Sequence, residues 1–148
     1  MKKVADIRII YKPKIKHSEL PEIFSTQEAH KLFIESWDIG RIYLMEQFKA
    51  MYLNNNGRVL CIFEISSGGL TSTNADARLI FLGAIKCCAT TIILAHNHPS
   101  GNLEPSDNDL IISRQLKEAG KLLDIKVYDH LIITPEGYTS MKKDGIIF

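Results

Sequence analysis

Residues 91–109 read T-I-I-L-A-H-N-H-P-S-G-N-L-E-P-S-D-N-D, the most specific pattern in the sequence. Its beginning, residues 91–95, is a short apolar run, which predicts a buried β-strand. Alternate side chains of a strand point to the same face, so His96 and His98 are expected to project together from the end of this strand. Pro99 then prevents the strand from continuing.

A helix is predicted shortly afterwards, over residues 107–119, with Ser106 as its N-cap and Gly120 as its end. Asp109 falls in the first turn of that helix, where its carboxylate can face back toward the end of the strand. Two imidazoles and one carboxylate, with room for a water molecule, form the ligand set of a catalytic zinc site. The structural alternative is a capped helix in which Asp109 only complements the helix dipole, and it leaves the paired histidines unexplained.

The same stretch resembles the JAMM signature of the JAB/MPN metalloprotein superfamily, which reads H-x-H-P, six residues, then S-x-x-D. Here the two pieces are His96-Asn97-His98-Pro99 and Ser106-Asp107-Asn108-Asp109. The longer motif, which includes P-S-G at 99–101, is similar to that of the RadC branch of the superfamily. The resemblance implies a three-layer α/β/α JAB/MPN-like (cytidine-deaminase-like) domain with a mixed β-sheet. It also implies one Zn2+ ion per chain, held by His96, His98 and Asp109.

JAMM enzymes also carry a catalytic glutamate well upstream of the histidines, and this chain offers two candidates. Glu46 precedes the first strand of a predicted hairpin, which is the place of the catalytic glutamate in JAMM proteins. The wording E-Q-F at 46–48 is also similar to the start of this strand in RadC relatives. Glu64 lies near the end of the second strand, where it could simply reach water. We therefore expect Glu46 to be the general base, with Glu64 or no positioned glutamate as the alternatives.

Three further polar residues in and near the motif have candidate roles. Ser106 would contribute about 1 kcal/mol as an N-cap, and the matching serine of JAMM enzymes also donates a hydrogen bond to the oxyanion of the tetrahedral intermediate. His130 lies within D-H-L-I at 129–132, a sequence similar to that of RadC proteins; a hydrogen-bonded structural role is favoured for it, with a functional role as the alternative. Asn97 should point away from the histidines and is also expected to be structural.

The composition is that of one globular domain. With 148 residues, of which 45% are hydrophobic, the chain is long enough to bury its own core. No apolar run approaches the ~20 residues of a membrane span, and residues 1–6 lack the apolar region of a signal peptide. Of the three cysteines, two are adjacent at 87 and 88, which indicates neither a disulfide framework nor a zinc ligand set. We therefore expect reduced thiols and a cytoplasmic protein.

The net charge of +1 is too small for an overtly basic nucleic-acid binder, although the charge is unevenly distributed. Residues 1–16 hold six Lys or Arg against one acid, so this arm carries +5 and the remainder carries −4. Such an arm could contact phosphate, but a solvated terminal segment is the simpler interpretation.

Along the whole chain, strands and helices alternate around a hairpin, which is typical of one α/β domain. We expect an N-terminal arm of residues 1–25, with an edge strand at 7–11 packed on the domain, and a RadC-like JAB/MPN domain at 26–148. Within the domain, the other predicted elements are a helix at 26–37 capped by Ser25 and Glu28, strands at 48–53 and 59–65 joined by an Asn56-Gly57 turn, a helix from Thr73 or Asn74 to about Cys88, and a strand at 125–133.

Two of these elements carry an expectation about their surroundings. The strand at 59–65 is apolar on both faces, which is typical of a covered strand in the centre of a sheet. The helix that ends near Cys88 has apolar residues almost all around it, so we expect it to be buried on more than one side.

These patterns favour a zinc-dependent JAMM-type hydrolase of the RadC family that acts on a peptide or isopeptide bond. One alternative is a DNA repair-associated protein acting on or near nucleic acid, which the near-neutral charge disfavours. Longer RadC proteins carry a helix-hairpin-helix-like N-terminal region for which this chain has no room, and this weakens the DNA argument further. The other alternative is a non-catalytic metal-binding interaction module, which the intact motif disfavours. We expect a peptide or protein substrate and no membrane partner, and the sequence favours no particular oligomeric state.

Overall fold

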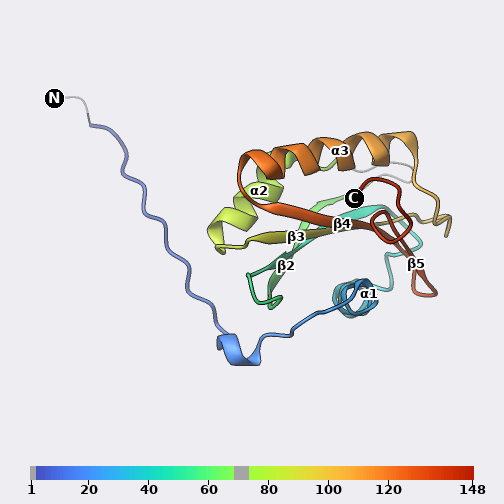
Figure 1. The fold of residues 1–148 in the computed structure, drawn as a ribbon, viewed down its shortest axis with the longest axis horizontal. Coiled ribbons are helices and arrows are strands. Elements are labelled where there is room, and N and C mark those ends of the chain that lie inside the picture. The colour runs from blue at the N-terminus through green and yellow to red at the C-terminus, as the bar shows by residue number, and fades with distance from the viewer. Residues whose placement is uncertain (1–2, 69–73) are drawn as a thin grey trace.

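A mixed five-stranded sheet in the order β2-β1-β3-β4-β5 forms the middle layer of the protein. The structure, a computed structural model, describes residues 3–68 and 74–148. In chain order the elements are η1 His17–Glu19, α1 Thr26–Ser36, β1 Gln47–Leu53, β2 Val59–Ser67, α2 Ala77–Lys86, β3 Thr91–Asn97, α3 Asp107–Leu122, β4 Lys126–Ile133 and β5 Tyr138–Ser140. Figure 1 shows α1 on one face of the sheet and α2 with α3 on the other. The expected three-layer α/β/α fold with a mixed sheet is therefore confirmed.

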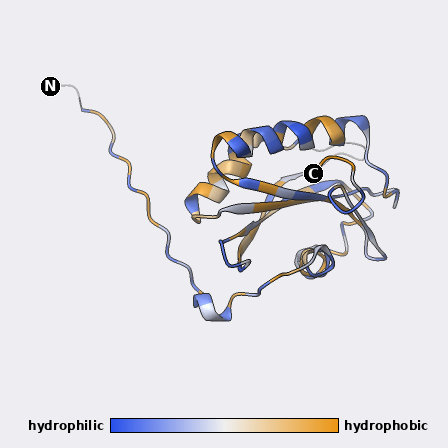
Figure 2. Cartoon of the chain, in the orientation of Figure 1, coloured by the Kyte–Doolittle hydropathy of each residue, from blue (hydrophilic) through white to orange (hydrophobic). Residues whose placement is uncertain are grey.

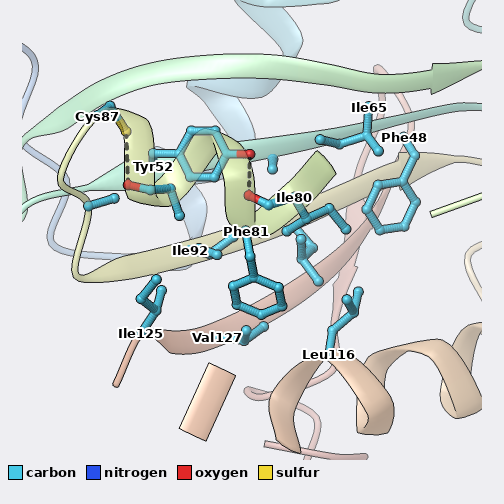
Figure 3. Close-up of a cluster of buried hydrophobic side chains, with 14 residues drawn as sticks. Phe48, Tyr52, Ile65, Ile80, Phe81, Cys87, Ile92, Leu116, Ile125 and Val127 are labelled. Carbon is cyan, nitrogen blue, oxygen red and sulfur yellow. Dashed lines mark hydrogen bonds between the residues drawn. The ribbon is translucent and has the colours of Figure 1, made fainter. Parts of the chain in front are cut away.

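Two hydrophobic clusters fill the spaces between the layers, because alternate residues of each strand face opposite helices. The larger cluster lies between the sheet and the α2–α3 layer, and Figure 3 shows Phe81 of α2 and Leu116 of α3 pointing into it. The second cluster joins Phe33 of α1 to the opposite face of the sheet. None of the helices within the described residues is long and apolar enough to cross a membrane.

The prediction of an edge strand at residues 7–11 is wrong. The structure assigns no strand to this segment, and the side chains of Ile7 and Ile9 are 88% and 81% exposed. In Figure 1 the blue N-terminal segment extends away from the sheet, although Tyr11 packs against the larger hydrophobic cluster. Residues 21–23, and not residues 7–11, pair with the beginning of the β2 edge. There the Val59 N–H donates to Pro21 O over 2.8 Å, and the Ile23 N–H donates to Gly57 O over 3.1 Å.

The β1–β2 hairpin forms as predicted, but its second strand is not in the centre of the sheet. Gly57 has a φ of +72°, which a tight turn requires and a glycine readily adopts. The expectation of a central 59–65 strand is wrong, since β2 lies at the edge and β1 is buried along its whole length. The buried strand β1 includes a lysine. Lys49 Nζ donates to Ser36 O over 2.8 Å and lies 4.5 Å from the centre of the Trp37 ring.

The helix α2 begins later than expected and is buried on one side only. Asp76 is its N-cap, with its carboxylate accepting from the Arg78 N–H over 2.9 Å. Of the two expected caps, Asn74 precedes the helix and Thr73 lies outside the described residues. Figure 2 shows how apolar this helix is, yet Leu82 and Ile85 are 59% and 51% exposed. The expectation of burial on more than one side is therefore wrong, because the sheet and α3 cover a single face.

The helix α3 continues past Gly120 to Leu122, so Gly120 does not end it. A Cβ atom at this position would collide with the backbone carbonyl oxygen of Ile125 and lie 3.0 Å from Val127 Cγ2. The glycine is therefore needed for close contact between α3 and the beginning of β4. That contact fixes α3 over the sheet, and the beginning of α3 carries Asp109.

Candidate metal centre

The two histidines of the motif converge at the carboxyl end of β3. His96 is the penultimate residue of that strand and His98 follows it directly. Their side chains lie on the same face, as the strand period predicts, and their Nε2 atoms are 2.9 Å apart. His96 is almost completely buried and His98 is partly exposed, so the pair spans the boundary between the core and a surface cavity.

Asp109 completes the group because the N-terminus of α3 holds its carboxylate in place. Ser106 and Asp109 form a capping box, in which the Asp109 N–H donates to Ser106 Oγ over 3.2 Å. In return, the Ser106 N–H donates to Asp109 Oδ2 over 2.7 Å. The carboxylate then presents one oxygen to each imidazole, with Oδ1 and Oδ2 each 3.3 Å from the Nε2 atom of His96 and His98, respectively.

These three side chains fit a metal ion. Their ligand atoms all lie within 4.8 Å of one another, and no other group of three such residues is found in the described part of the chain. Four ligands placed tetrahedrally about 2.0–2.1 Å from a zinc ion lie roughly 3.3 Å from one another, which is close to the separations seen here. His98 is already prepared for binding through Nε2, because its Nδ1–H donates to the backbone oxygen of Asn102 over 2.8 Å.

The electrostatics of the group favour a cation. Burial alone would raise the pKa of Asp109, but the imidazoles of His96 and His98 beside its carboxylate outweigh burial and hold the pKa far below its usual range. The hydrogen bond to Asp109 in turn raises the pKa of His98 against the effect of burial. The proton of His98 and a metal ion would therefore compete for the same position beside the Asp109 carboxylate.

Glu46 lies in the cavity with the three candidate ligands, whereas Glu64 does not. The cavity has a volume of about 390 Å3, and Glu46, His96, His98 and Asp109 all line it. Glu46 is 7% exposed, and burial raises its pKa although the nearby histidines lower it. Glu64 instead accepts a hydrogen bond from Gln47 Nε2 over 3.1 Å, away from the cavity lining.

Ser106 also lines the cavity, so both roles considered for it are compatible with its position. Its hydroxyl accepts the Asp109 N–H, which confirms the expected N-cap. Accepting this bond uses only a lone pair of the oxygen, and the hydroxyl hydrogen can still be donated to a group inside the cavity.

Asn97 points to the opposite face of the sheet and is structural, as expected. Its Oδ1 accepts the Gln47 N–H over 2.8 Å, and its Nδ2 donates to Ile42 O and Met45 O over 2.6 and 2.9 Å. These bonds fix the main chain on both sides of Glu46. The middle residue of H-N-H therefore helps to place the glutamate, a connection that sequence spacing does not reveal.

Two residues behind the ligands are more closely involved than the sequence indicated. His130 of β4 is fully buried, and its Nε2 lies 2.8 Å from Nδ1 of His96. Ser113 of α3 places its hydroxyl 2.6 Å from Nδ1 of His130. Burial lowers the pKa of His130 well below its usual range, so the ring is neutral. Phe48 covers both imidazoles, stacking on His96 at 6.0 Å between ring centres and meeting His130 edge-on at 5.2 Å.

The sequence matches the family described as RadC-like JAB domain over residues 23–146. Among curated proteins, a UPF0758 protein of Flavobacterium johnsoniae is 45% identical over 101 residues, which cover 68% of this chain and 44% of the relative. A UPF0758 protein of Desulforudis audaxviator is 39% identical over 126 residues, covering 85% of this chain and 54% of the relative. The chain thus spans about half the length of the curated relatives it matches.

Proposed function

This chain belongs to the RadC-like JAB domain family, and from that membership we propose that it is a zinc-dependent hydrolase that cleaves a peptide or isopeptide bond. The observation that supports the proposal is a single cavity lined by His96, His98 and Asp109 together with a buried glutamate and a serine hydroxyl. A metal ligand set, a base and a hydrogen-bond donor are the parts that metal-assisted hydrolysis requires.

Zinc bound by two neutral imidazoles and one carboxylate would keep a positive charge, polarise a carbonyl group and lower the pKa of water to ~7. Glu46 would take the proton of the attacking water as oxygen adds to the carbonyl carbon. The raised pKa of Glu46 makes its carboxylate a stronger base than an exposed glutamate. Glu46 would then deliver this proton to the nitrogen of the leaving amine as the C–N bond breaks.

Ser106 would stabilise the negative charge that develops on the carbonyl oxygen. Its hydroxyl belongs to the first residue of a rigid capping box, so it would need little rearrangement to donate to that oxygen. The same capping box holds Asp109, and the donor and the metal ligand are therefore positioned by one structural element.

The lining of the cavity favours an amide over a phosphodiester substrate. Among the residues described, the side chains around this cavity include the acids Glu46, Glu104 and Asp109 but no lysine or arginine. A nucleic-acid substrate would bring additional negative charge toward these acids, whereas an amide carbonyl is neutral. We therefore propose a peptide or protein as the substrate. We also propose a reducing, cytoplasmic location, in keeping with the free thiols Cys61, Cys87 and Cys88.

The proposal is tested by an unbiased hydrolysis screen on the zinc-loaded chain. The panel should contain peptides, isopeptide-linked conjugates, and single- and double-stranded DNA, with the His96→Ala/His98→Ala variant as the control. We expect amide hydrolysis that the chelated protein and the double variant lack. Cleavage of DNA alone would instead support the repair-associated alternative, and zinc binding without any turnover would support the interaction module.

A further inference from the structure

We propose that His130 and Ser113 are positioning residues that fix the tautomer of His96, so that the lone pair of His96 Nε2 faces the metal. Sequence resemblance assigns the three ligands, but it does not say what orients them. This inference rests on the zinc centre of the proposed function and adds a hydrogen-bond relay behind it.

The relay consists of three short hydrogen bonds that lead from the metal ligand back to the helix that carries Asp109. His96 Nδ1 lies 2.8 Å from His130 Nε2, and His130 Nδ1 lies 2.6 Å from Ser113 Oγ. The Ser113 hydroxyl is 2.6 Å from the backbone oxygen of Asp109. The path thus begins at one candidate ligand on β3 and ends on the main chain of another on α3.

The backbone oxygen of Asp109, at the end of the relay, fixes the direction in which its hydrogen bonds are donated. The backbone oxygen of Asp109 can only accept, so the Ser113 hydroxyl donates to it and keeps its lone pairs for an incoming hydrogen. Ser113 can therefore only accept from His130, so Nδ1 of that ring carries the hydrogen, and a ring with a single hydrogen leaves Nε2 as an acceptor. His96 must donate from Nδ1 to this acceptor, and its own Nε2 is left with a free lone pair.

The opposite direction would disable His96 as a ligand. If the Ser113 hydroxyl donated to His130 Nδ1, the His130 hydrogen would lie on Nε2 and point at His96 Nδ1. His96 would then hold its own hydrogen on Nε2, in the space required by the metal. His98 does not face this choice, because its Nδ1 partner is the Asn102 carbonyl, which cannot donate.

The surroundings keep water from replacing either positioning residue. Ser113 is fully buried and His130 is 1% exposed, and Phe48 covers the imidazoles of His96 and His130. The sulfur of Met141 lies 3.2 Å from the Ser113 hydroxyl and is a weaker acceptor than the Asp109 carbonyl. Loss of either positioning residue would therefore leave a buried N–H without an equivalent partner.

The direction can be measured on the unmodified protein. Long-range proton–nitrogen NMR of 15N-histidine-labelled, zinc-loaded chain shows which nitrogen of each ring carries hydrogen. We expect the hydrogen on Nδ1 in both His96 and His130. A hydrogen on Nε2 of His130 in the zinc-loaded protein would overturn the proposal, and no substitution is needed to obtain this result.

Variants test the consequence for binding by chelator competition. His130→Leu removes the acceptor and should weaken zinc binding about 10–100-fold, the usual effect of losing such a partner. His130→Gln can place a carbonyl oxygen where Nε2 lay, so it should bind about tenfold more tightly than His130→Leu. Ser113→Ala should shift His130 toward the Nε2–H tautomer. His30→Leu is the matched control, because His30 bonds to Thr134 O outside the cavity and should leave zinc affinity unchanged.

The outcomes separate this inference from the proposed function. Zinc binding of wild-type strength by a folded His130→Leu variant would overturn the relay and leave the hydrolase proposal standing. Zinc binding that follows the expected order, without hydrolysis of any substrate, would support the relay and contradict the proposed activity. Failure of the wild-type chain to bind zinc would overturn both.

Discussion

Asn97 holds Glu46 in place from the opposite face of the sheet. The Asn97 side chain accepts the N–H of the residue after Glu46 and donates to the carbonyl of the residue before it, over 2.8 and 2.9 Å. The proposed base is thus bracketed by a residue that lies between the two histidines of the motif. The strand that presents the two histidines on one face positions the base from the other.

The assignment of the base predicts different effects for two conservative substitutions. Glu46→Gln retains size and hydrogen bonding but removes the basic carboxylate, so turnover should fall by roughly 10²–10⁴ while zinc content stays near that of the wild type. Glu64→Gln should change turnover little, since Glu64 bonds to Gln47 outside the cavity. Steady-state kinetics on the substrate from the screen measures both, and a larger loss for Glu64→Gln would reverse the assignment.

The hydrogen bonds that Asn97 makes on both sides of Glu46 predict a loss of stability and turnover for Asn97→Asp. This variant keeps the acceptor for Gln47 but loses the two donations to backbone carbonyls, so the free energy of unfolding should fall by about 2 kcal/mol or more. Urea denaturation measures this change. Turnover should fall further than zinc affinity, because the ligands lie on the other face. Asn55→Asp, in the exposed hairpin turn, is the control and should alter neither quantity.

The ligand set predicts one zinc ion per chain. Elemental analysis of protein purified without added metal should find zinc near stoichiometry in the wild type and only traces in the His96→Ala/His98→Ala double variant. Stoichiometric zinc that persists in the double variant would show that the metal binds elsewhere.

The raised pKa of His98 predicts that zinc binding releases protons near neutral pH. Asp109 stabilises the protonated imidazole in the zinc-free protein, and zinc must displace that proton. Zinc affinity should therefore fall as the pH falls. Calorimetric titration in buffers of different ionisation enthalpy counts the protons, and heats that do not depend on the buffer would contradict the prediction.

The raised pKa of His98 also makes the stability of the zinc-free protein depend on pH. The folded pKa of His98 lies above its unfolded value of about 6.5, so the folded state binds the proton more tightly. The resulting stabilisation is complete below that unfolded value and is lost as the pH rises through the raised pKa. Denaturation of the chelated protein on both sides of this window should detect the loss, and His98→Ala should abolish it.

Removal of zinc should leave the protein folded. The two hydrophobic clusters lie between the layers and do not depend on the metal, so chelation should preserve the near-ultraviolet circular dichroism. Zinc at 100 times its Kd would add about 2.7 kcal/mol, or roughly 5–10 °C in Tm for a domain of this size. Collapse of the aromatic signal on chelation would point instead to a structural metal.

The sequence predicted most of the fold and the grouping of His96, His98 and Asp109, because these features depend on residues close together in the chain. A strand period brings the histidines to one face, and a capping box turns Asp109 toward them. The errors arose where distant contacts override local pattern. The 59–65 strand was expected to be central because it is apolar on both faces, but β1 is the buried strand, and its Lys49 ammonium group donates to Ser36 O at the end of α1.

Gly120 and His130 show the same limit. Gly120 reads as a helix terminator by composition, but the close approach of β4 requires it inside the helix. His130 was expected to be structural, and its wording gave no indication that it bonds to His96, 34 residues earlier. Neither contact has a signature in local spacing, since each depends on how two elements pack.

The ligands of the centre also belong to different layers of the fold, with the histidines at the end of a strand and Asp109 on a helix. An ion bound by all three would act as a clamp between the sheet and the first turn of α3. Backbone amides in that turn should then exchange their hydrogens for deuterium more slowly when the site is filled. Metal occupancy could thus be followed by mass spectrometry on peptides that span residues 107–112, without any knowledge of the substrate.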